Sequence, residues 1–398
     1  MQVAVLGGKL QGVEAVYLAQ KAGWQVILVD RDQAAPAVGM CDQFLQFDML
    51  DKDQLRQLFN EVQFVIPALE NQAAMESIKQ CALAAGVKTF YDPAAYQLSS
   101  SKIKSDRLFA DLELPVPNPW PCGFPVTIKP SGASGSAHVY KVNTPEDFKE
   151  LIRRLGNSEE WVIQEYLPGP SYSIEVVGCQ GAYRPFQITE LEMDDVYDCQ
   201  RVLTPAELSP EKVQEFKDCA VKIARAINLN GIMDVEVILH DHQLKVLEID
   251  ARLPSQTPTV VYKSTGINLL EALWSNCAGK NEASDTGQNR GVVYEHIKVA
   301  GKRLEVCGEH IMSGAGHLHI YDDFFGAEEA ISNFSKDKAE WVATLIITGK
   351  DRNEAWARRC RVLQKIMTLY GINEYVDTRM LKFRETAQDN FLYYQTSR

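Results

Sequence analysis

The stretch KVLEIDARLPSQTPT, residues 245–259, is an apolar run interrupted by acids. Together with GIMDVEV at residues 231–237, it predicts two neighbouring strands that bring Asp234, Glu248 and Asp250 close together. Glu248 and Asp250 are two residues apart and therefore share one face of their strand. Clustered carboxylates require a cation, and magnesium is a hard ion that binds carboxylate oxygens and nucleotide phosphates together. The stretch therefore predicts a magnesium site, although a half-buried strand with a polar outer face would show the same E-x-D pattern.

A cation and a polar loop follow directly on this acidic strand. Arg252 lies on the same predicted face as the two acids, so a fixed positive charge stands beside fixed negative charges. Pro254 then ends the strand, because proline cannot donate a backbone hydrogen bond to a neighbouring strand. The loop that begins there is rich in Ser, Thr and Gln, and its residues Ser255 and Thr257 are suited to hold a substrate carboxylate.

Length and composition restrict the class of protein. A chain of 398 residues is long enough for two or three domains with separate cores. No apolar run has the length of a membrane span and the N-terminus does not resemble a signal peptide, so we expect a cytoplasmic protein without a membrane partner. Its nine cysteines include no C-x-x-C pair, which argues against a disulfide framework and a zinc site. The net charge of −12 opposes nucleic-acid binding and suits cationic small substrates.

The N-terminal part of the chain alternates strand and helix patterns, which predicts a doubly wound α/β domain over residues 1–95. The expected strands are Gln2–Leu6, Gln25–Val29, Gln43–Phe47, Phe64–Pro67 and Thr89–Tyr91, and the expected helices are Val13–Ala22, Asp53–Phe59 and Ala73–Ala85.

The first turn of this domain, GGKLQG at residues 7–12, has three interpretations. With Asp30 at the spacing of a ribose-binding acid, it is similar to a dinucleotide fingerprint. However, Lys9 replaces the second glycine of that fingerprint, where any side chain keeps the backbone away from a pyrophosphate. A plain turn, or the capture of another anionic or amino-acid ligand at the helix N-terminus, explains the loop as well.

A second domain is expected over residues 96–285, behind a proline-rich connector. Within it, one strand ends at Lys129 and leads into a loop of small residues, Ser131–Ser136, whose two glycines allow backbone amides to fold over phosphate groups. A flexible hairpin without a ligand is the alternative, and the position of Lys129 favours the phosphate site.

Two further segments complete the chain. The stretch WVIQEYLPGPSYSIEVV, residues 161–177, predicts two strands whose exposed backbone edge can pair with adenine. Residues 286–398 alternate strands with a helix near 352–370, and we expect them to form a third, C-terminal domain.

The order of these features resembles the ATP-grasp superfamily of carboxylate–amine ligases. The shared features are a strand that ends in a lysine, a Ser/Gly loop, an E-Y-L hinge and a pair of acidic strands, all after a small α/β domain. The resemblance implies an α/β, ATP-grasp fold with a Rossmann-like N-terminal (pre-ATP-grasp) domain and a C-terminal α+β domain. It also implies ATP as the cofactor, together with two magnesium ions.

The same resemblance implies roles for individual residues. Nucleotide contacts are implied for Lys104, Lys129, Ser131, Gly132, Ser134, Gly135, Ser136, Gln164, Glu165 and Leu167. Magnesium ligands are implied at Asp234, Glu248 and Asp250, and catalytic roles for Lys129, Asp234 and Arg252. Two positions depart from the family pattern, because Ser171 stands where a ribose-binding glutamate is usual and Asp250 where asparagine is usual. Ribose contacts must then come from elsewhere, while Asp250 still suits magnesium.

A closer resemblance is to the pyrrolysine-biosynthesis ligases, a family that joins 3-methyl-D-ornithine to the side-chain amine of L-lysine. It is carried by GGKLQG, PALEN at 67–71, YDC at 197–199, EIDARLPSQTPT at 248–259, CGEH at 307–310 and FFGAEEAI at 324–331. These motifs extend into the C-terminal third, which the general ATP-grasp features do not reach.

This resemblance implies small-molecule substrates and allows for a homodimer. The implied contacts to an ornithine-type substrate are Lys9, Leu10, Gln11, Glu70 and Asn71, and the loop residues Arg252, Ser255 and Thr257 complete the substrate site. Glu190 and Asp198 are candidates for recognising or deprotonating the lysine amine. Three other functions stay open at this point: a different ATP-grasp amino-acid ligase or a bicarbonate-using carboxylase, an NAD-dependent amino-acid dehydrogenase, and an amino-acid sensor that releases no ADP.

Overall fold

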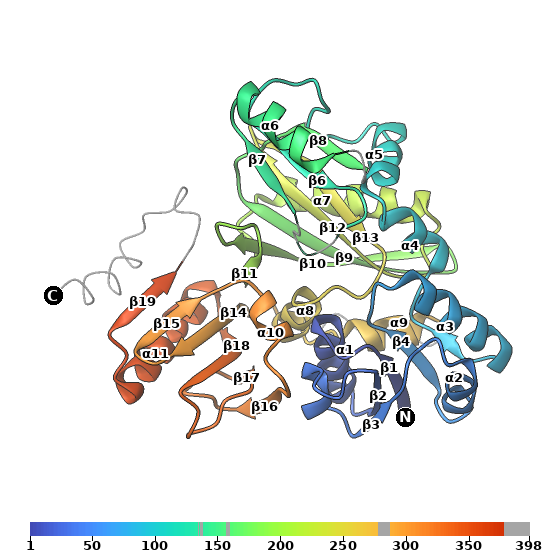
Figure 1. Cartoon of the computed structure of the whole chain (residues 1–398), viewed down its shortest axis with the longest axis vertical. Coiled ribbons are helices and arrows are strands. Elements are labelled where there is room, and N and C mark those ends of the chain that lie inside the picture. The colour runs from blue at the N-terminus through green and yellow to red at the C-terminus, as the bar shows by residue number, and fades with distance from the viewer. Residues whose placement is uncertain (134, 136–137, 157–159, 278–286, 378–398) are drawn as a thin grey trace.

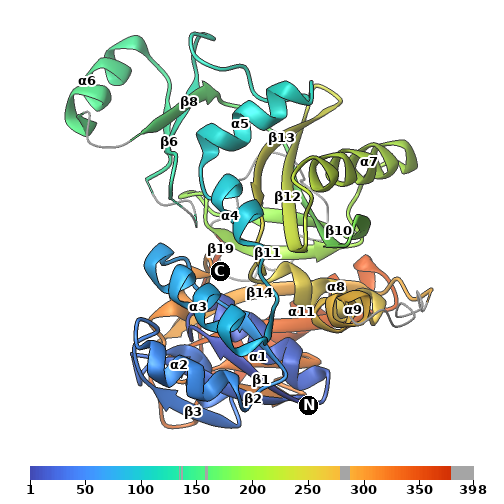
Figure 2. The same cartoon turned by 90° about the vertical axis from the view of Figure 1, so that its right-hand side faces the viewer.

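The computed structural model describes residues 1–398 with the exception of 134, 136–137, 157–159, 278–286 and 378–398 (Figure 1). An upper lobe, which contains α5, α6, α7 and the acidic strands, stands over an N-terminal and a C-terminal domain that lie side by side (Figure 1). Viewed from the side, the upper lobe stands above the N-terminal sheet, with α6 at its far end (Figure 2).

The N-terminal domain is a parallel five-stranded sheet with strand order β3-β2-β1-β4-β5. Its apolar strand β1, with four of its five residues buried, lies at the centre. The strands are β1 (Gln2–Leu6), β2 (Gln25–Asp30), β3 (Gln43–Gln46), β4 (Phe64–Pro67) and β5 (Lys88–Thr89), and the helices are α1 (Leu10–Lys21), η1 (Pro36–Gly39), α2 (Lys52–Phe59) and α3 (Gln72–Ala85). Helix α4 (Pro93–Ser99) follows in the chain and packs against the upper lobe.

Close packing shapes the loop between β1 and α1. Gly7 has a φ of +108°, and a Cβ built there would lie 2.3 Å from the carbonyl oxygen of Ala68. Only glycine fits this position, so the loop approaches the end of β4 closely. Helix α1 begins at Leu10, three residues earlier than the sequence pattern predicts, so Leu10 and Gln11 belong to its first turn.

The upper lobe combines a small antiparallel sheet with the acidic end of a large one. The small sheet has the order β7-β6-β8. Its elements and neighbours are α5 (Lys102–Asp111), β6 (Val126–Pro130), β7 (Tyr140–Val142), α6 (Pro145–Leu155) and β8 (Trp161–Glu165).

Within the described residues, the large sheet has eleven strands and runs without a break from the upper lobe into the C-terminal domain, in the order β13-β12-β9-β10-β11-β14-β18-β17-β16, with β15 beside β14 and β19 beside β15. Its strands are β9 (Ser171–Cys179), β10 (Ala182–Met193), β11 (Cys199–Thr204), β12 (Gly231–His240), β13 (Gln243–Asp250), β14 (Gly291–Ala300), β15 (Arg303–Val306), β16 (His319–Asp322), β17 (Glu329–Ser332), β18 (Glu340–Gly349) and β19 (Glu374–Asp377). The accompanying helices are α7 (Pro210–Ala226), α8 (Thr257–Thr265), α9 (Leu269–Cys277), α10 (His310–Ser313) and α11 (Arg352–Tyr370).

The two predicted acidic strands are confirmed as the antiparallel pair β12 and β13. Their register sets Asp234 opposite Asp250 and Glu236 opposite Glu248. Residues opposite each other in such a pair have their side chains on the same face of the sheet, so the four carboxylates form one cluster.

Helices α8 and α9 join the N-terminal domain to the large sheet. Trp274 of α9 stacks on Phe64 of β4, with ring centroids 5.3 Å apart. The buried Glu14 of α1 accepts a hydrogen bond of 2.6 Å from the backbone N–H of Thr259, at the start of α8. The chain that follows the acidic strands therefore packs against the N-terminal domain, and the domain boundaries near residues 95 and 285 stay predictions. None of the described helices combines the length and the apolar character needed to cross a membrane.

Candidate active site

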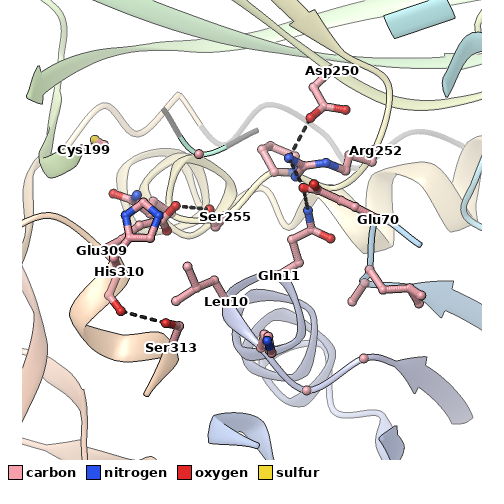
Figure 3. A pocket seen from close by; sticks show the side chains of 18 of the residues that line it. Leu10, Gln11, Glu70, Cys199, Asp250, Arg252, Ser255, Glu309, His310 and Ser313 are labelled. Atoms are coloured by element: carbon pink, nitrogen blue, oxygen red, sulfur yellow. Dashed lines mark hydrogen bonds and ion pairs between the residues drawn. The ribbon is translucent and has the colours of Figure 1, made fainter. Parts of the chain in front are cut away.

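A cavity of about 600 Å³ lies where the three parts of the molecule meet. Its walls come from the loop before α1, the ends of β12 and β13, and helix α10 of the C-terminal domain (Figure 3). The lining includes these predicted site residues: Lys9, Leu10, Gln11, Glu70, Asn71, Gly135, Asp198, Asp234, Glu248, Asp250, Arg252, Ser255 and Thr257. The structure thus brings together most of the residues predicted to bind substrate and metal.

The four carboxylates of β12 and β13, together with Arg252, form what we term the carboxylate end of the cavity. Oδ1 of Asp234 and Oδ1 of Asp250 are buried without a hydrogen-bond partner. Burial and the neighbouring Asp250 hold the pKa of Asp234 well above its usual range. Burial and the negative charge of Glu248 raise the pKa of Glu236 to about 7, and burial raises that of Asp250 to about 6. Unpaired carboxylate oxygens that repel one another are the donor set that a divalent cation neutralises.

These donors fit a magnesium ion that is only partly held by protein. In the described part of the chain, no three His, Cys, Asp or Glu side chains already surround a metal position by themselves. Magnesium usually keeps several waters and binds proteins through one or two carboxylates plus substrate phosphates. Asp234, Glu248 and Asp250 could therefore supply part of the magnesium coordination, and water and nucleotide phosphates would supply the rest. Sequence reasoning missed Glu236, although its spacing of two residues from Asp234 was a sufficient signal.

Arg252 connects the carboxylate end to the N-terminal domain. Its Nη2 lies 2.7 Å from Oε1 of Glu70 and 2.7 Å from Oδ2 of Asp250. Gln11 donates a 3.0 Å hydrogen bond to the same oxygen of Glu70 (Figure 3). One guanidinium thus contacts both a predicted metal ligand and a predicted substrate residue, so charge at one position affects the other.

The lysine that reaches the carboxylates from α5 is Lys102, and the structure does not support the assignment of Lys104. Nζ of Lys102 lies 2.9 Å from Oε1 of Glu248 and 2.5 Å from the carbonyl oxygen of Ala133. Lys104 is exposed, and its Nζ donates a 3.3 Å hydrogen bond to the carbonyl oxygen of Gln97. Helix α5 begins at Lys102, and two residues correspond to a rotation of about 200° around a helix, so the two lysines point in different directions.

Lys129 is buried at the end of β6, and its Nζ donates a 3.2 Å hydrogen bond to the carbonyl oxygen of Leu247. Burial lowers its pKa, against the attraction of Glu248. Both buried lysines therefore lie beside the carboxylate end. The two lysines can bind phosphate groups, and the carboxylates beside them can bind the magnesium ion that accompanies those groups.

The remaining nucleotide contacts stay predictions. Ser131 accepts a 3.2 Å hydrogen bond from the backbone N–H of Ile103, which ties the start of the Ser/Gly loop to α5. Gly132 follows it, with open space around its Cα. Ser134 and Ser136 lie outside the described residues. Gln164 and Leu167 are buried at the junction of the two sheets, and Glu165 accepts hydrogen bonds from Asn118 and Lys245. These three hinge residues do not line the cavity described above.

The loop before α1 is held in a way that does not favour dinucleotide binding. Both carboxylate oxygens of Asp30 accept backbone hydrogen bonds, one from Gly8 at 2.7 Å and one from Asp32 at 2.9 Å. The acid that a ribose would require is thus used by the loop itself. Asn71 caps helix α3 through Ala74, so its side chain has a structural role as well as a place in the lining.

Glu190 does not line the cavity, so the structure does not place it with the other predicted substrate residues, and its role stays a prediction. Its carboxylate lies 2.7 Å from Nη1 of Arg352, the first residue of α11, on the C-terminal side of the sheet. A buried carboxylate needs such a partner, and strand alternation alone could not reveal one that lies 162 residues away.

Asp198, by contrast, faces the cavity with two residues that sequence reasoning left without a role. We term Asp198, Glu309 and His310 the histidine end. Oδ2 of Asp198 lies 2.6 Å from Nδ1 of His310 and accepts a 3.1 Å hydrogen bond from its backbone N–H. Glu309 accepts a 3.2 Å hydrogen bond from Ser255, and its burial raises its pKa. Both residues belong to the CGEH segment, which was the available signal. In Figure 3, Glu309 and His310 lie to the left of Leu10 and Gln11, and Arg252 lies above Gln11.

Comparison with known proteins identifies the family of the chain. The ATP-grasp domain family matches residues 99–256, and the PylC-like N-terminal domain family matches residues 3–90. The chain is 34% identical over 373 residues to the 3-methyl-D-ornithine–L-lysine ligase of Methanosarcina barkeri, covering 93% of this chain and 98% of that protein. The ligase of the same name from Methanosarcina mazei is also 34% identical, with coverages of 93% and 96%.

Solved structures share the fold at lower identity. A biotin carboxylase of Campylobacter jejuni superposes with a TM-score of 0.71 at 15% identity, over 91% of each chain. An L-amino acid ligase of Bacillus licheniformis superposes with a TM-score of 0.67 at 16% identity, over 92% of this chain and 97% of that one. The fold and the site thus define an ATP-grasp ligase, an enzyme that uses ATP to form a C–N bond. Within that class, the chain belongs to the family of the 3-methyl-D-ornithine–L-lysine ligases.

Proposed function

We propose that the protein joins the carboxylate of 3-methyl-D-ornithine, or of D-ornithine, to the side-chain amine of L-lysine in pyrrolysine biosynthesis, with ATP and two magnesium ions. The observation that carries the proposal is the cavity in which the carboxylate end faces Gln11 and Glu70 of the N-terminal domain. The residues that would bind phosphate and the acid that would bind an ammonium group thus line the same cavity. The names of the relatives from Methanosarcina support the same reaction.

The reaction needs ATP because a carboxylate is a poor electrophile. Transfer of the terminal phosphoryl group converts it to an acyl phosphate, which an amine can attack. Lys102 and Lys129 would hold the phosphate groups, and Arg252 would stabilise the charge that develops on the tetrahedral intermediate. Magnesium, bound through Asp234, Glu248 and Asp250, would neutralise the transferring phosphoryl group.

Substrate recognition would divide between the two ends of the cavity. The ornithine-type substrate carries an ammonium group, for which Glu70 is the acidic partner in the N-terminal domain, beside Gln11. The acids Asp198 and Glu309 at the histidine end would receive the cationic second substrate. This division leaves the reacting carboxylate between Arg252 and the attacking amine.

The test is magnesium-dependent ADP release with D-ornithine and L-lysine added separately and together, followed by mass analysis of the product. The proposal expects fast ADP release only with both amino acids and a product that contains one of each. ADP release that requires bicarbonate, or none with any amino acid, would exclude it. A homodimer and a cytoplasmic location belong to the same proposal, and size-exclusion chromatography with light scattering checks the dimer.

A further inference from the structure

His310 forms a pair with Asp198 that leaves one ring nitrogen open to the cavity. Nδ1 of His310 is 2.6 Å from Asp198, whose side chain is only 9% exposed, whereas that of His310 is 55% exposed. A neutral imidazole in this arrangement donates from Nδ1 and accepts at Nε2. A Cβ built on Gly135, in the Ser/Gly loop, would lie 3.5 Å from Nε2. Nε2 of His310 therefore points to the part of the cavity that Gly135 borders.

The surrounding backbone is built to hold Asp198 in place. The carboxylate of Asp194 accepts backbone hydrogen bonds of 2.9 Å from both Val196 and Asp198, which closes the turn between β10 and β11. A Cβ built on Gly308 would lie 2.4 Å from the Cβ of Asp198, so no side chain fits there. The backbone N–H of Glu309 also bonds to the carbonyl oxygen of Cys199 at 3.1 Å. Three separate features thus fix the pair, which argues against an accidental surface contact.

The proposed reaction requires a base close to the attacking amine. The side-chain amine of free lysine has a pKa of about 10.4, so it enters the site as an ammonium group. Two protons must leave its nitrogen before the amide is complete. Among the described residues that line the cavity, Asp250 and Glu248 already pair with Arg252 and Lys102, whereas Nε2 of His310 makes no hydrogen bond or ion pair.

On the basis of the proposed function, we propose that His310, oriented by Asp198, is the general base that deprotonates the attacking amine. Nε2 takes the first proton from the ammonium group. The freed electron pair on nitrogen forms the C–N bond with the acyl carbon, and the C–O bond to phosphate breaks. The departing phosphate takes the second proton, so protons and charges balance. His310 then returns its proton to solvent.

The charges around His310 suit this task. Partial burial lowers the pKa of His310, but the facing carboxylates of Asp198, Glu309 and Asp194 outweigh it, so the pKa lies above its ordinary value. A base works best when its pKa is close to the working pH. Because the base must be neutral, amine attack should slow as the pH falls through this raised pKa.

Hydroxylamine separates the two halves of the reaction, because it is unprotonated at neutral pH and traps an acyl phosphate as a hydroxamate without a base. The experiment compares hydroxamate formation from D-ornithine with ligation to L-lysine in wild type, His310→Gln and the control His319→Gln, which lies in a separate surface pocket. We expect His310→Gln to slow ligation at least about 100-fold while hydroxamate formation changes by less than about threefold, and His319→Gln to change neither.

A second variant guards against a merely structural effect. Asp198→Asn keeps the shape of the side chain but removes its charge, so the pKa of His310 should fall and the acidic limb of ligation should move to lower pH. Hydroxamate formation is measured over the same pH range, so that the titration of groups other than His310 can be recognised by its effect on both reactions. A parallel loss of both activities in His310→Gln, unchanged ligation, or an unmoved acidic limb in Asp198→Asn would overturn the assignment. A wild type that forms neither the hydroxamate nor the ligation product would instead overturn the proposed function itself.

Discussion

The two ends of the cavity solve different electrostatic problems. At the carboxylate end, four acids lie on paired strands of a large sheet, and Arg252 and Lys102 already neutralise part of their charge. At the histidine end, the groups come from a turn and from the short helix α10, and more than half of the His310 side chain is accessible. Rigid strands hold charges that must stay close despite repulsion, whereas loops hold a group that must meet an incoming substrate. The following predictions test this division, from the largest effect to the smallest.

Removal of one charge at the carboxylate end should nearly abolish the reaction. Glu248→Gln takes away a predicted magnesium ligand and leaves Lys102 beside a neutral side chain. We expect turnover to fall by at least about 100-fold, since even the loss of an outer-shell partner costs 10- to 100-fold. The measurement is ADP release at saturating magnesium, with Asp218→Asn on the exposed face of α7 as the matched control. Near-normal turnover of Glu248→Gln would contradict the metal assignment.

The two lysines of α5 should differ sharply. Lys102→Met should lower kcat/KM for ATP by about 10- to 100-fold, because a hydrogen bond to a charged group is worth about 1.5–3 kcal/mol. Lys104→Met should stay within about twofold of wild type, because that side chain is exposed. Steady-state kinetics with varied ATP decides between them. If Lys104→Met were the damaged variant, the placement of α5 against β13 would be incorrect.

A charge change in the N-terminal wall of the cavity should alter the KM of one substrate only. Glu70→Gln removes the negative charge beside Arg252 and Gln11. We expect KM for D-ornithine to rise by roughly tenfold, with KM for ATP unchanged, because a substrate ammonium loses its charged partner. Glu61→Gln, on the exposed surface of the same domain, serves as the control. An equal rise in both KM values would mean that Glu70 acts through Asp250 and not on substrate.

The smallest effect concerns pH and magnesium. The raised pKa values of Glu236, about 7, and Asp250, about 6, mean that both carboxylates bind protons more readily than free acids. Magnesium must displace the proton of its predicted ligand Asp250, so its apparent affinity should fall by at least about twofold as the pH falls from 8 to 6, because about half of that carboxylate is protonated at pH 6. The half-saturating magnesium concentration for ADP release measures this at both pH values. A constant requirement would show that these acids are ionised before the metal binds.

Local sequence patterns predict the paired strands because alternation of apolar and acidic residues reports directly on strand faces. The N-terminal domain is also largely predictable from its regular strand and helix periods, although α1 begins earlier than predicted, β5 lies at Lys88–Thr89 and not at Thr89–Tyr91, and η1 was not predicted. The choice between Lys102 and Lys104 is harder, because it depends on the residue at which a helix begins. His310 and Asp198 are 112 residues apart, and neither lies on a periodic element, so no local pattern could pair them. Glu190 was predicted to be available for substrate, but it pairs with Arg352, which lies far away in the sequence, and no local pattern could show that partner.

The central claim is that ATP activates the carboxylate of the ornithine-type substrate in this cavity. The most direct measurement uses D-ornithine whose carboxylate carries heavy oxygen, with ATP, magnesium and L-lysine, followed by mass analysis of the released phosphate. An acyl phosphate intermediate transfers one carboxylate oxygen to phosphate, so we predict one heavy oxygen in each phosphate and one in the amide product. Phosphate that contains only oxygen from ATP and water would contradict the account.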